Sequence, residues 1–304
     1  MASENLAGRS IAGYRLLERV GEGGTAEVYR AEHPDHGPCA FKVLRPRLRG
    51  DPTAVKRFLR EASYGARVRH AGVVRTYDYG EADGLYYLAL EWAGGQSLAD
   101  FLHQNAPVAP ALVADIINQL AHGLAAAHQV GIVHRDLKPE NIVYDKESNV
   151  AKLLDFGIAR DAELPPEERL TRTGFFVGTL QYVAPEALSG ELVDARADIY
   201  SLATIAYYML TAHHPFTGRN PRELFQQLLK ESPVPLSQAL PEARFPPALE
   251  AAVMRGLSRD PAQRQSTVTG LAQEIAAGAS GTAAPSGSGF MGAFRKLMGG
   301  KKEQ

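Results

Sequence analysis

The stretch His134-Arg135-Asp136-Leu137-Lys138-Pro139-Glu140-Asn141 decides the fold, and Asp155-Phe156-Gly157 follow it on the far side of an expected β-hairpin. An aspartate, a lysine and an asparagine thus lie within six residues, and a second aspartate comes after them. Carboxylate and amide oxygens are ligands for magnesium, and a lysine neutralises phosphate charge. The combination indicates a site that orients a hydroxyl group and holds magnesium against a polyphosphate.

Composition indicates a soluble globular protein. The chain has 304 residues, of which 45% are hydrophobic and 22% charged, with a net charge of -1. This balance argues against a nucleic-acid partner bound through bulk charge. The single cysteine, Cys39, excludes an internal disulfide and suits a reducing compartment. No signal peptide or apolar run of about 20 residues is visible, so we expect a cytoplasmic protein.

The periodicity of apolar residues changes once along the chain. From Tyr14 to about Ala93 the segments are short and strand-like, interrupted by one helix that Asp51 caps. From Ala109 onward helical spacing dominates, and 198–211 form a largely apolar helix. The change predicts an α+β protein with two lobes. Apolar faces are expected at Val55, Phe58, Leu59 and Ala62 in the first helix, and at Val113, Ile116, Ile117, Leu120 and Leu124 in the second lobe.

A glycine-rich segment from Gly21 to Val28 lies between two strand-like segments, 14–20 and 28–32. Glycine lets the backbone approach phosphate oxygens and direct its N–H groups toward them. A strand follows the glycines instead of a helix, which excludes a dinucleotide fingerprint. An ordinary glycine-rich hairpin without a ligand remains the alternative.

Lys42 lies in a strand whose period of two places Ala40, Lys42 and Leu44 on one face. The other face carries Cys39, Phe41 and Val43. A lysine on an apolar face needs an anionic partner. Glu61, three residues after Phe58 in the predicted helix, is the candidate; the alternative is that both charges are solvated.

These motifs and their order resemble those of Hanks-type protein kinases, in particular the bacterial serine/threonine branch, from about Tyr14 to about Ala277. The resemblance implies a bilobal fold with a small antiparallel β-sheet lobe with one main helix (about 14–93) and a larger, mostly helical lobe (about 97–277). An extension (1–13) would precede it. The matching positions are Gly21 to Val28, Ala40-Phe41-Lys42, Glu61, His134 to Asn141, Asp155 to Gly157, Gly178-Thr179, Ala184-Pro185-Glu186, Asp198 and Arg264.

The resemblance implies ATP and Mg²⁺ as cofactors, with Mn²⁺ as an alternative ion. Asp136 would orient the substrate hydroxyl or accept its proton, and Lys138 would neutralise charge on the transferred group. Asn141 and Asp155 would hold the metal ions, and Lys42, fixed by Glu61, would bind the α- and β-phosphates.

The resemblance also implies a binding site for the nucleotide between the lobes. Leu90 would be the gatekeeper, and backbone groups of Glu91 and Ala93 would bind the adenine edge. Trp92, between Glu91 and Ala93 in the hinge that would connect the two lobes, is interpreted as a packing aromatic. The adenine would lie between Val20, Val28, Ala40 and Val143, and the phosphates beneath Gly21, Glu22, Gly23, Gly24, Thr25 and Ala26.

Substrate class and regulation follow from the same resemblance. Lys138-Pro139-Glu140 and Gly178-Thr179 are typical of kinases that act on serine and threonine. His134 and Asp198 resemble residues that brace the catalytic loop, and Glu186 with Arg264 resembles a buried ion pair. We expect autophosphorylation at Thr171 and Thr173, whose phosphate would pair with Arg135; the alternative is two solvated loop threonines.

We therefore predict an ATP-dependent serine/threonine protein kinase of bacterial signalling, with protein substrates and activation by autophosphorylation. A pseudokinase or scaffold is the main alternative, and a small-molecule kinase is a third. Lys42, Asp136 and Asp155 are all present, which favours an active enzyme. Because relatives of this type often dimerise through the small lobe, a homodimer is one option.

The C-terminal sequence differs from the rest. Glycine, alanine and serine dominate after about residue 278, which predicts a flexible linker. Residues 290–298 have an amphipathic pattern, and Lys301 and Lys302 follow. The segment is short for an isolated helix. We expect a disordered tail, with partner docking and membrane contact as the lesser alternatives.

Overall fold

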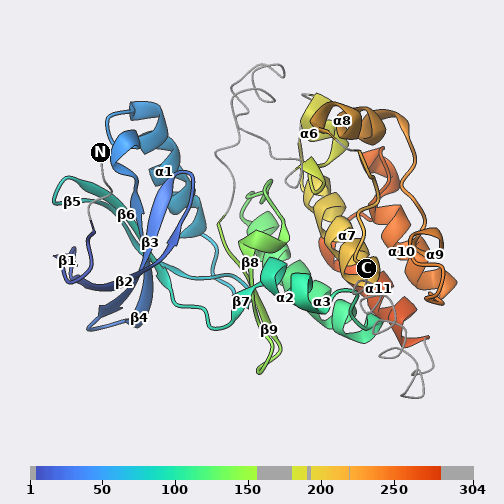
Figure 1. Cartoon of the computed structure of the whole chain (residues 1–304), viewed down its shortest axis with the longest axis horizontal. Helices are drawn as coiled ribbons and strands as arrows, with labels where there is room; N and C mark the ends of the chain where they lie inside the picture. Colours follow the sequence, from blue (N-terminus) through green and yellow to red (C-terminus); the bar gives the residue numbers. More distant parts are fainter. Residues whose placement is uncertain (1–4, 156–179, 190–192, 219, 282–304) are drawn as a thin grey trace, which may run out of the picture.

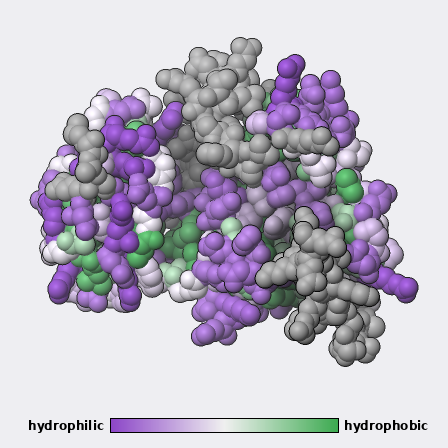
Figure 2. Space-filling view, in the orientation of Figure 1, coloured by the Kyte–Doolittle hydropathy of each residue, from purple (hydrophilic) through white to green (hydrophobic). Residues whose placement is uncertain are grey.

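The computed structural model describes residues 5–155, 180–189, 193–218 and 220–281. Figure 1 shows two lobes side by side: strands and helix α1 (Pro52–Gly65) form the smaller lobe, and helices make up most of the larger one. Figure 2 shows that this face is largely hydrophilic, with apolar residues visible where the two lobes meet. This is the predicted α+β architecture.

The small lobe contains a six-stranded antiparallel sheet with the order β1-β2-β3-β4-β6-β5. Cys39, Phe41 and Val43 are buried in the core on one face of the sheet. Ala40 and Leu44 pack on the other face against α1, so the predicted alternation is confirmed. The strands are β1 (Ser10–Ile11), β2 (Tyr14–Glu22), β3 (Ala26–His33), β4 (Gly37–Leu44), β5 (Thr76–Ala82) and β6 (Leu85–Glu91).

Helix α1 begins where its capping residue predicts. The Asp51 side chain accepts a hydrogen bond from the Thr53 N–H at 2.9 Å, and Pro52 is the first helical residue. Phe58 and Ala62 are buried against the sheet. The apolar stripe therefore determines which side of α1, and so which charged residues, faces the sheet.

The sheet begins before Tyr14, in the segment that we predicted to be an extension. Ser10 and Ile11 form β1, which pairs with the start of β2. Leu6 and Ile11 are buried together with Tyr14 in the core of the small lobe. Apolar burial therefore makes residues 6–11 part of this lobe, although the family motifs start later.

The large lobe is built around α3 (Pro110–Gln129) and α7 (Arg196–Thr211). The predicted apolar face of α3 is buried, and α7 is buried on nearly all sides, as its apolar sequence indicated. The other elements are η1 (Pro46–Leu48), in the small lobe, and β7 (Gln96–Ser97), α2 (Leu98–Asn105), η2 (Pro139–Asn141), β8 (Ile142–Asp145), β9 (Val150–Leu153), α6 (Pro185–Ser189), α8 (Pro221–Lys230), α9 (Leu236–Ala239), α10 (Pro247–Gly256), η3 (Pro261–Gln263) and α11 (Val268–Ser280).

Helix α11 extends to Ser280, two residues beyond the predicted start of the linker at 278. Gly278 packs so closely against α10 that a Cβ atom there would lie 2.5 Å from the backbone nitrogen of Leu249. This glycine therefore serves helix packing, whereas in the sequence it looked like part of a linker. The predicted tail helix at 290–298 lies outside the described residues.

Within the described ranges, the helices are all too short or too polar to span a lipid bilayer.

Candidate active site

The stretch from His134 to Asn141, called the catalytic loop below, brings the predicted polar side chains together just before the β8–β9 hairpin. The Asn141 side-chain amide donates to the Asp136 carbonyl oxygen at 2.8 Å and to its Oδ2 at 3.0 Å. The Lys138 ammonium lies 3.3 Å from the same Oδ2. The short helix η2 explains this proximity, because its tight turn carries the chain from Lys138 back to Asn141.

Asp198, at the start of α7, holds the backbone of this loop. Its fully buried carboxylate accepts hydrogen bonds from the N–H groups of His134 at 2.8 Å and Arg135 at 3.0 Å. His128 Nε2 is 2.8 Å from the same carboxylate. Arg135 has a φ of 62°, which is unfavourable for a side chain of this size. The paired N–H groups stabilise that conformation.

His134 connects the catalytic loop to the strand that leads to Asp155. Its ring is fully buried, and Nε2 donates to the carbonyl oxygen of Leu154 at 3.0 Å. The Leu154 N–H in turn donates to the carbonyl of Asn141 at 2.9 Å. These bonds hold Asn141 and Asp155 in a fixed relation.

The partner of Lys42 differs from the prediction. Its ammonium contacts the Asp155 carboxylate directly, and the described residues contain no ion pair between Lys42 and Glu61. Burial favours the neutral amine, but the Asp155 carboxylate and then Glu61 outweigh it and raise the pKa of Lys42. One ammonium faces two carboxylates, and Asp155 forms the contact.

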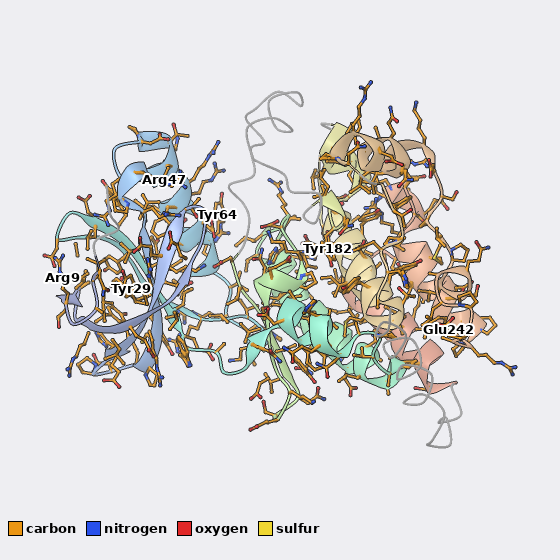
Figure 3. All side chains as sticks on the ribbon, in the orientation of Figure 1. Arg9, Tyr29, Arg47, Tyr64, Tyr182 and Glu242 are labelled. Atoms are coloured by element: carbon orange, nitrogen blue, oxygen red, sulfur yellow. The ribbon has the colours of Figure 1, made fainter. Side chains whose placement is uncertain are left out.

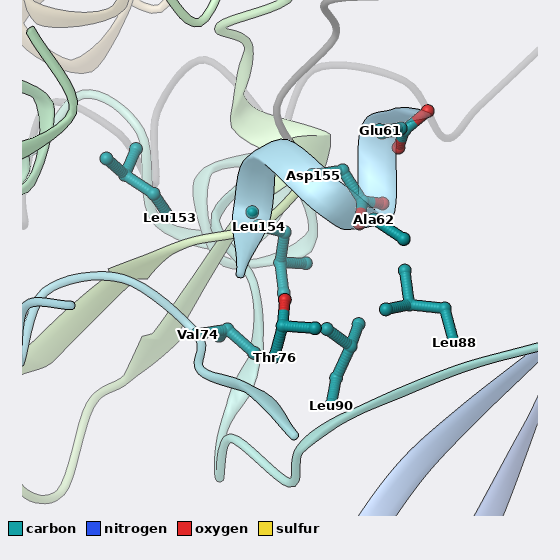
Figure 4. Close-up of a pocket in the computed structure, with 10 residues that line it drawn as sticks. Glu61, Ala62, Val74, Thr76, Leu88, Leu90, Leu153, Leu154 and Asp155 are labelled. Carbon is teal, nitrogen blue, oxygen red and sulfur yellow. The ribbon is translucent and has the colours of Figure 1, made fainter. Parts of the chain in front are cut away.

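Glu61 remains beside this pair without contacting the ammonium. Burial raises its pKa to about 7, the charge of Asp155 adds to the shift, and Lys42 opposes it. Figure 4 shows Glu61 and Asp155 at one end of a small cavity and Val74, Thr76 and Leu90 at the other. The cavity volume of about 20 Å³ is that of roughly one water molecule.

A larger cavity of about 390 Å³ lies between the sheet and the β8–β9 hairpin, a size suited to a small-molecule ligand. Eleven residues predicted for nucleotide or metal binding line it: Gly23, Thr25, Ala26, Val28, Ala40, Lys42, Leu90, Glu91, Ala93, Val143 and Asp155.

Some predicted nucleotide residues do not line this cavity. Val20 lies at a break in the β2–β3 register, and 47% of its surface is exposed. The break interrupts the regular alternation of side chains along the strand, and the Val20 side chain does not face the cavity. Gly21, Glu22 and Gly24 are also absent from the lining.

Sequence reasoning missed three lining residues: Val74, Trp92 and Leu154. Trp92 was interpreted as a packing aromatic, yet it borders the cavity and lies beneath Arg30, whose guanidinium is 5.4 Å from the ring centroid. The position of Leu154 immediately before Asp155 was a sequence signal that could have identified it. The sequence contains no such signal for Val74, because Val74 lies in an irregular segment far from the motifs.

The hinge residue Glu91 also joins the two lobes through its side chain. Its carboxylate contacts Lys152 of β9 and accepts a hydrogen bond from the Arg75 N–H at 3.2 Å. Nothing in the family motifs marks Lys152, so this contact was not predicted.

The buried ion pair implied by the resemblance is present. Arg264 binds both carboxylate oxygens of Glu186, at 2.7 and 2.8 Å, and the two side chains are 0% and 4% exposed. The arginine also donates to the carbonyl oxygens of Arg196 and Ser258 at 2.8 Å. The remaining regulatory candidates, Thr171, Thr173 and Thr179, lie outside the described residues.

The donor set fits a magnesium or manganese ion. Asp155 offers carboxylate oxygens, and Asn141 uses its NH₂ group on Asp136, which leaves its carbonyl oxygen available as a ligand. The described part of the chain holds no cluster of three or more histidine, cysteine or acidic residues that suits a metal. Magnesium is commonly bound by one or two side chains together with phosphate oxygens and water.

A family model described as the protein kinase domain matches residues 14–276. The chain therefore belongs to the protein kinase family. Serine/threonine-protein kinase PknB of Mycolicibacterium smegmatis is 39% identical over 267 residues, which are 86% of this chain and 42% of that relative. Serine/threonine-protein kinase pkn3 of Myxococcus xanthus is 36% identical over 282 residues, which are 90% of this chain and 52% of that relative.

Solved structures agree with this assignment. The kinase domain of PknI from Mycobacterium tuberculosis has a TM-score of 0.69 and 30% identity, and the match covers 92% of this chain and 99% of that domain. The Rad53 crystal structure in complex with AMP-PNP has a TM-score of 0.69 and 27% identity, covering 86% of this chain and 64% of that one. The predicted resemblance to the bacterial serine/threonine branch and the predicted fold are confirmed.

Proposed function

We propose that this chain is a serine/threonine protein kinase that transfers the γ-phosphoryl group of Mg-ATP to hydroxyl groups of proteins in bacterial signalling. The observation that carries the proposal is the grouping of Asp136, Lys138 and Asn141 close to Lys42 and Asp155. The chain spans only about half the length of its curated relatives or less, so the activity is argued from this site.

The side chains divide the work of phosphoryl transfer. Asp136 orients the attacking hydroxyl and accepts its proton, and Lys138 next to it offsets charge on the transferred group. Asn141 and Asp155 hold the metal, which when bound supplies positive charge against the phosphates. Lys42 binds phosphate oxygens, and the cavity beneath the sheet holds the adenine.

ATP as the phosphoryl donor has two lines of support. The cavity volume of about 390 Å³ lies within the range of roughly 300–1,000 Å³ for small-molecule sites. The structurally similar Rad53 was solved in complex with AMP-PNP. Serine and threonine as acceptors are supported by the names of the relatives.

The test is transfer of radiolabel from ATP with magnesium to the protein itself and to a generic serine- and threonine-containing protein. We expect Asp136→Asn to lower the transfer rate by at least about 100-fold, the scale of a lost general base. Binding of Mg-ATP should persist, because Asp136 lies outside the cavity lining. Labelling by neither protein contradicts the proposal and favours a scaffold, and equal labelling by both contradicts the role of Asp136 on which the proposal depends.

We further propose that phosphorylation of Thr171 and Thr173 activates the enzyme through Arg135. The support is indirect: the Arg135 backbone is held by Asp198 right next to Asp136. An ordered phosphate partner for this guanidinium would stabilise the loop that carries the catalytic aspartate.

We also propose that the enzyme works in a reducing compartment. Cys39 is buried and unpaired, which supports a reducing compartment such as the cytoplasm. A homodimer through the small lobe remains a prediction, and sedimentation of the purified chain at several concentrations would test it.

A further inference from the structure

The turn of the glycine-rich loop is bound by the segment that follows β4. Three successive carbonyl oxygens accept hydrogen bonds from it: Gly23 from Arg45 Nη1 at 3.1 Å, Gly24 from Arg47 Nη2 at 2.6 Å, and Thr25 from the Arg45 backbone N–H at 3.0 Å. The three peptide groups that connect residues 23 to 26 therefore all accept hydrogen bonds from the same short segment.

Arg45 is itself held in place. Glu22 accepts from Arg45 Nη2 at 2.5 Å and from Arg19 Nη1 at 3.1 Å. The Arg45 side chain is 26% exposed, so more than half of it is packed against neighbours. Figure 3 shows Arg47 beside helix α1 in the small lobe. The strand register, which pairs Ala26 with Leu44, places both arginines next to the turn.

Peptide planarity converts these contacts into a statement about the loop N–H groups. In a trans peptide the C=O of one residue and the N–H of the next point in opposite directions. The carbonyls of Gly23, Gly24 and Thr25 point toward the arginine segment, so the N–H groups of Gly24, Thr25 and Ala26 point away from it. In the described ranges the N–H groups of Gly24 and Thr25 have no protein acceptor.

A row of N–H groups with no protein acceptor is suited to bind anionic oxygen atoms. Gly23, Thr25 and Ala26 border the large cavity, whereas Arg45 and Arg47 do not. The arginines therefore cannot act by lining the ligand site, and their effect on a ligand must pass through the loop.

We propose that Arg45 and Arg47 are positioning residues for the nucleotide phosphates. By binding the loop carbonyls from behind, they direct the successive N–H groups of Gly24, Thr25 and Ala26 to the phosphate oxygens. The inference rests on the proposed function in taking Mg-ATP as the ligand. It predicts that the arginines contribute to phosphate binding and leave adenosine binding unchanged.

The experiment compares Mg-ATP with adenosine in the full chain. Trp92 is the single tryptophan and borders the cavity, so its fluorescence reports both ligands. Arg45→Met and Arg47→Met should each weaken Mg-ATP binding by about 5- to 10-fold, the scale of one ordinary hydrogen bond, because the arginines act on the ligand only through the loop. Adenosine affinity should stay within about 2-fold, which also shows that the cleft is folded.

Arg49→Met is the matched control, because Arg49 lies in the same segment but donates to the Leu44 carbonyl at 3.0 Å instead of to the glycine loop. Its affinities for both ligands should match those of wild type. Repeating the titrations at about 0.05 and 0.5 M KCl separates positioning from long-range attraction, which salt screens. The ratio of wild-type to variant affinity should stay constant.

Several results would overturn the inference. These are unchanged Mg-ATP affinity in both variants, an equal loss of adenosine affinity, or a loss that vanishes at high salt. A wild type that binds Mg-ATP no more tightly than adenosine also overturns it. A wild type that binds Mg-ATP more tightly, with the expected losses in the variants, but transfers no phosphoryl group contradicts the proposed function alone.

Discussion

At the scale of single residues, two carboxylates near the catalytic loop compete for one lysine. Lys42 contacts Asp155, and Glu61 keeps a raised pKa beside them. Each carboxylate could have been the partner of the lysine, and the sequence pattern alone pointed to Glu61. The direct contact goes to Asp155, which β9 and the His134–Leu154 hydrogen bond bring to the ammonium.

His214 is a second residue whose ionisation depends on its surroundings. Its ring stacks on Tyr208 with centroids 4.7 Å apart and meets the edge of Tyr182 at 5.4 Å. Its Nδ1 is buried and has no hydrogen-bond partner within the described part of the chain. Burial lowers the pKa of His214 to about 4, and the neighbouring His213 adds to the shift.

This lowered pKa predicts a pH dependence of stability. The unfolded chain binds a proton at His214 near pH 6.5, whereas the folded protein does so near pH 4, so the free energy of unfolding falls as pH drops between these values. His214→Phe keeps the ring stacking and removes the titration. The free energy of unfolding of the variant minus that of wild type, measured by urea unfolding, should therefore be more positive at pH 5 than at pH 8.

His103→Phe is the control for this comparison, since His103 is exposed. Its difference from wild type should be the same at both pH values. If His214→Phe behaved like the control, the buried imidazole would not be the titrating group.

At the scale of elements, one ion pair joins α6 to the segment before α11. Glu186 lies in α6, and Arg264 follows η3 and also binds the carbonyl of Arg196 in α7. The pair is almost fully buried, and the arginine lies 5.0 Å from the Tyr200 ring centroid. Three separate parts of the large lobe thus meet at one guanidinium.

Arg264→Met should lower the free energy of unfolding by about 3 to 5 kcal/mol, because it leaves the Glu186 carboxylate buried without its partner. Arg255→Met is the matched control: Arg255 pairs with Glu274 at 2.8 Å, but the two side chains are 50% and 39% exposed. Loss of that pair should cost about 1 kcal/mol or less. Equal costs in chemical denaturation would contradict the assigned importance of burial.

At the scale of the whole molecule, the site exists only because two lobes meet. The glycine loop, Lys42 and the hinge come from the small lobe, and Asp136, Asn141 and Asp155 come from the large one. Backbone bonds between Val74 and Leu153 and between Leu153 and Gly72, both 2.9 Å, tie β9 to the small-lobe side, and Lys152 contacts Glu91. These contacts set the relation of the lobes in this structure.

Phosphorylation of Thr171 and Thr173 should change the activity of this whole assembly. The double variant Thr171→Ala/Thr173→Ala should phosphorylate a generic protein at least about 10-fold more slowly than the phosphorylated wild type, the scale of one or two lost charged hydrogen bonds. Phosphatase treatment should bring wild type down to the same rate. Initial rates measured with saturating Mg-ATP provide the comparison.

Thr217→Ala is the control, because Thr217 is an exposed threonine elsewhere in the large lobe. Its rate should equal that of wild type. If phosphatase treatment left the wild-type rate unchanged, the two threonines would not be the activating sites, whatever the double variant did.

Much of the fold and the site was predictable from local sequence patterns. Asp51 and Pro52 marked the start of α1, alternation in β4 gave the two faces, and apolar spacing gave the buried side of α3. The loop from His134 to Asn141 could be recognised for the same reason: its side chains meet within a few residues. Such features depend on neighbours in sequence, where backbone geometry limits the alternatives.

Tertiary structure decided what depends on residues distant in sequence. Lys42 and Asp155 are 113 positions apart, and only packing brings them together in preference to Lys42 and Glu61. The role of Gly278 in helix packing and the contacts of Arg45 and Arg47 with the glycine loop likewise follow from close approach between elements. The sequence alone therefore identified a protein kinase and predicted which groups react, while three-dimensional packing determined which residues they contact, because hydrogen bonds and ion pairs depend on distances that no local pattern contains.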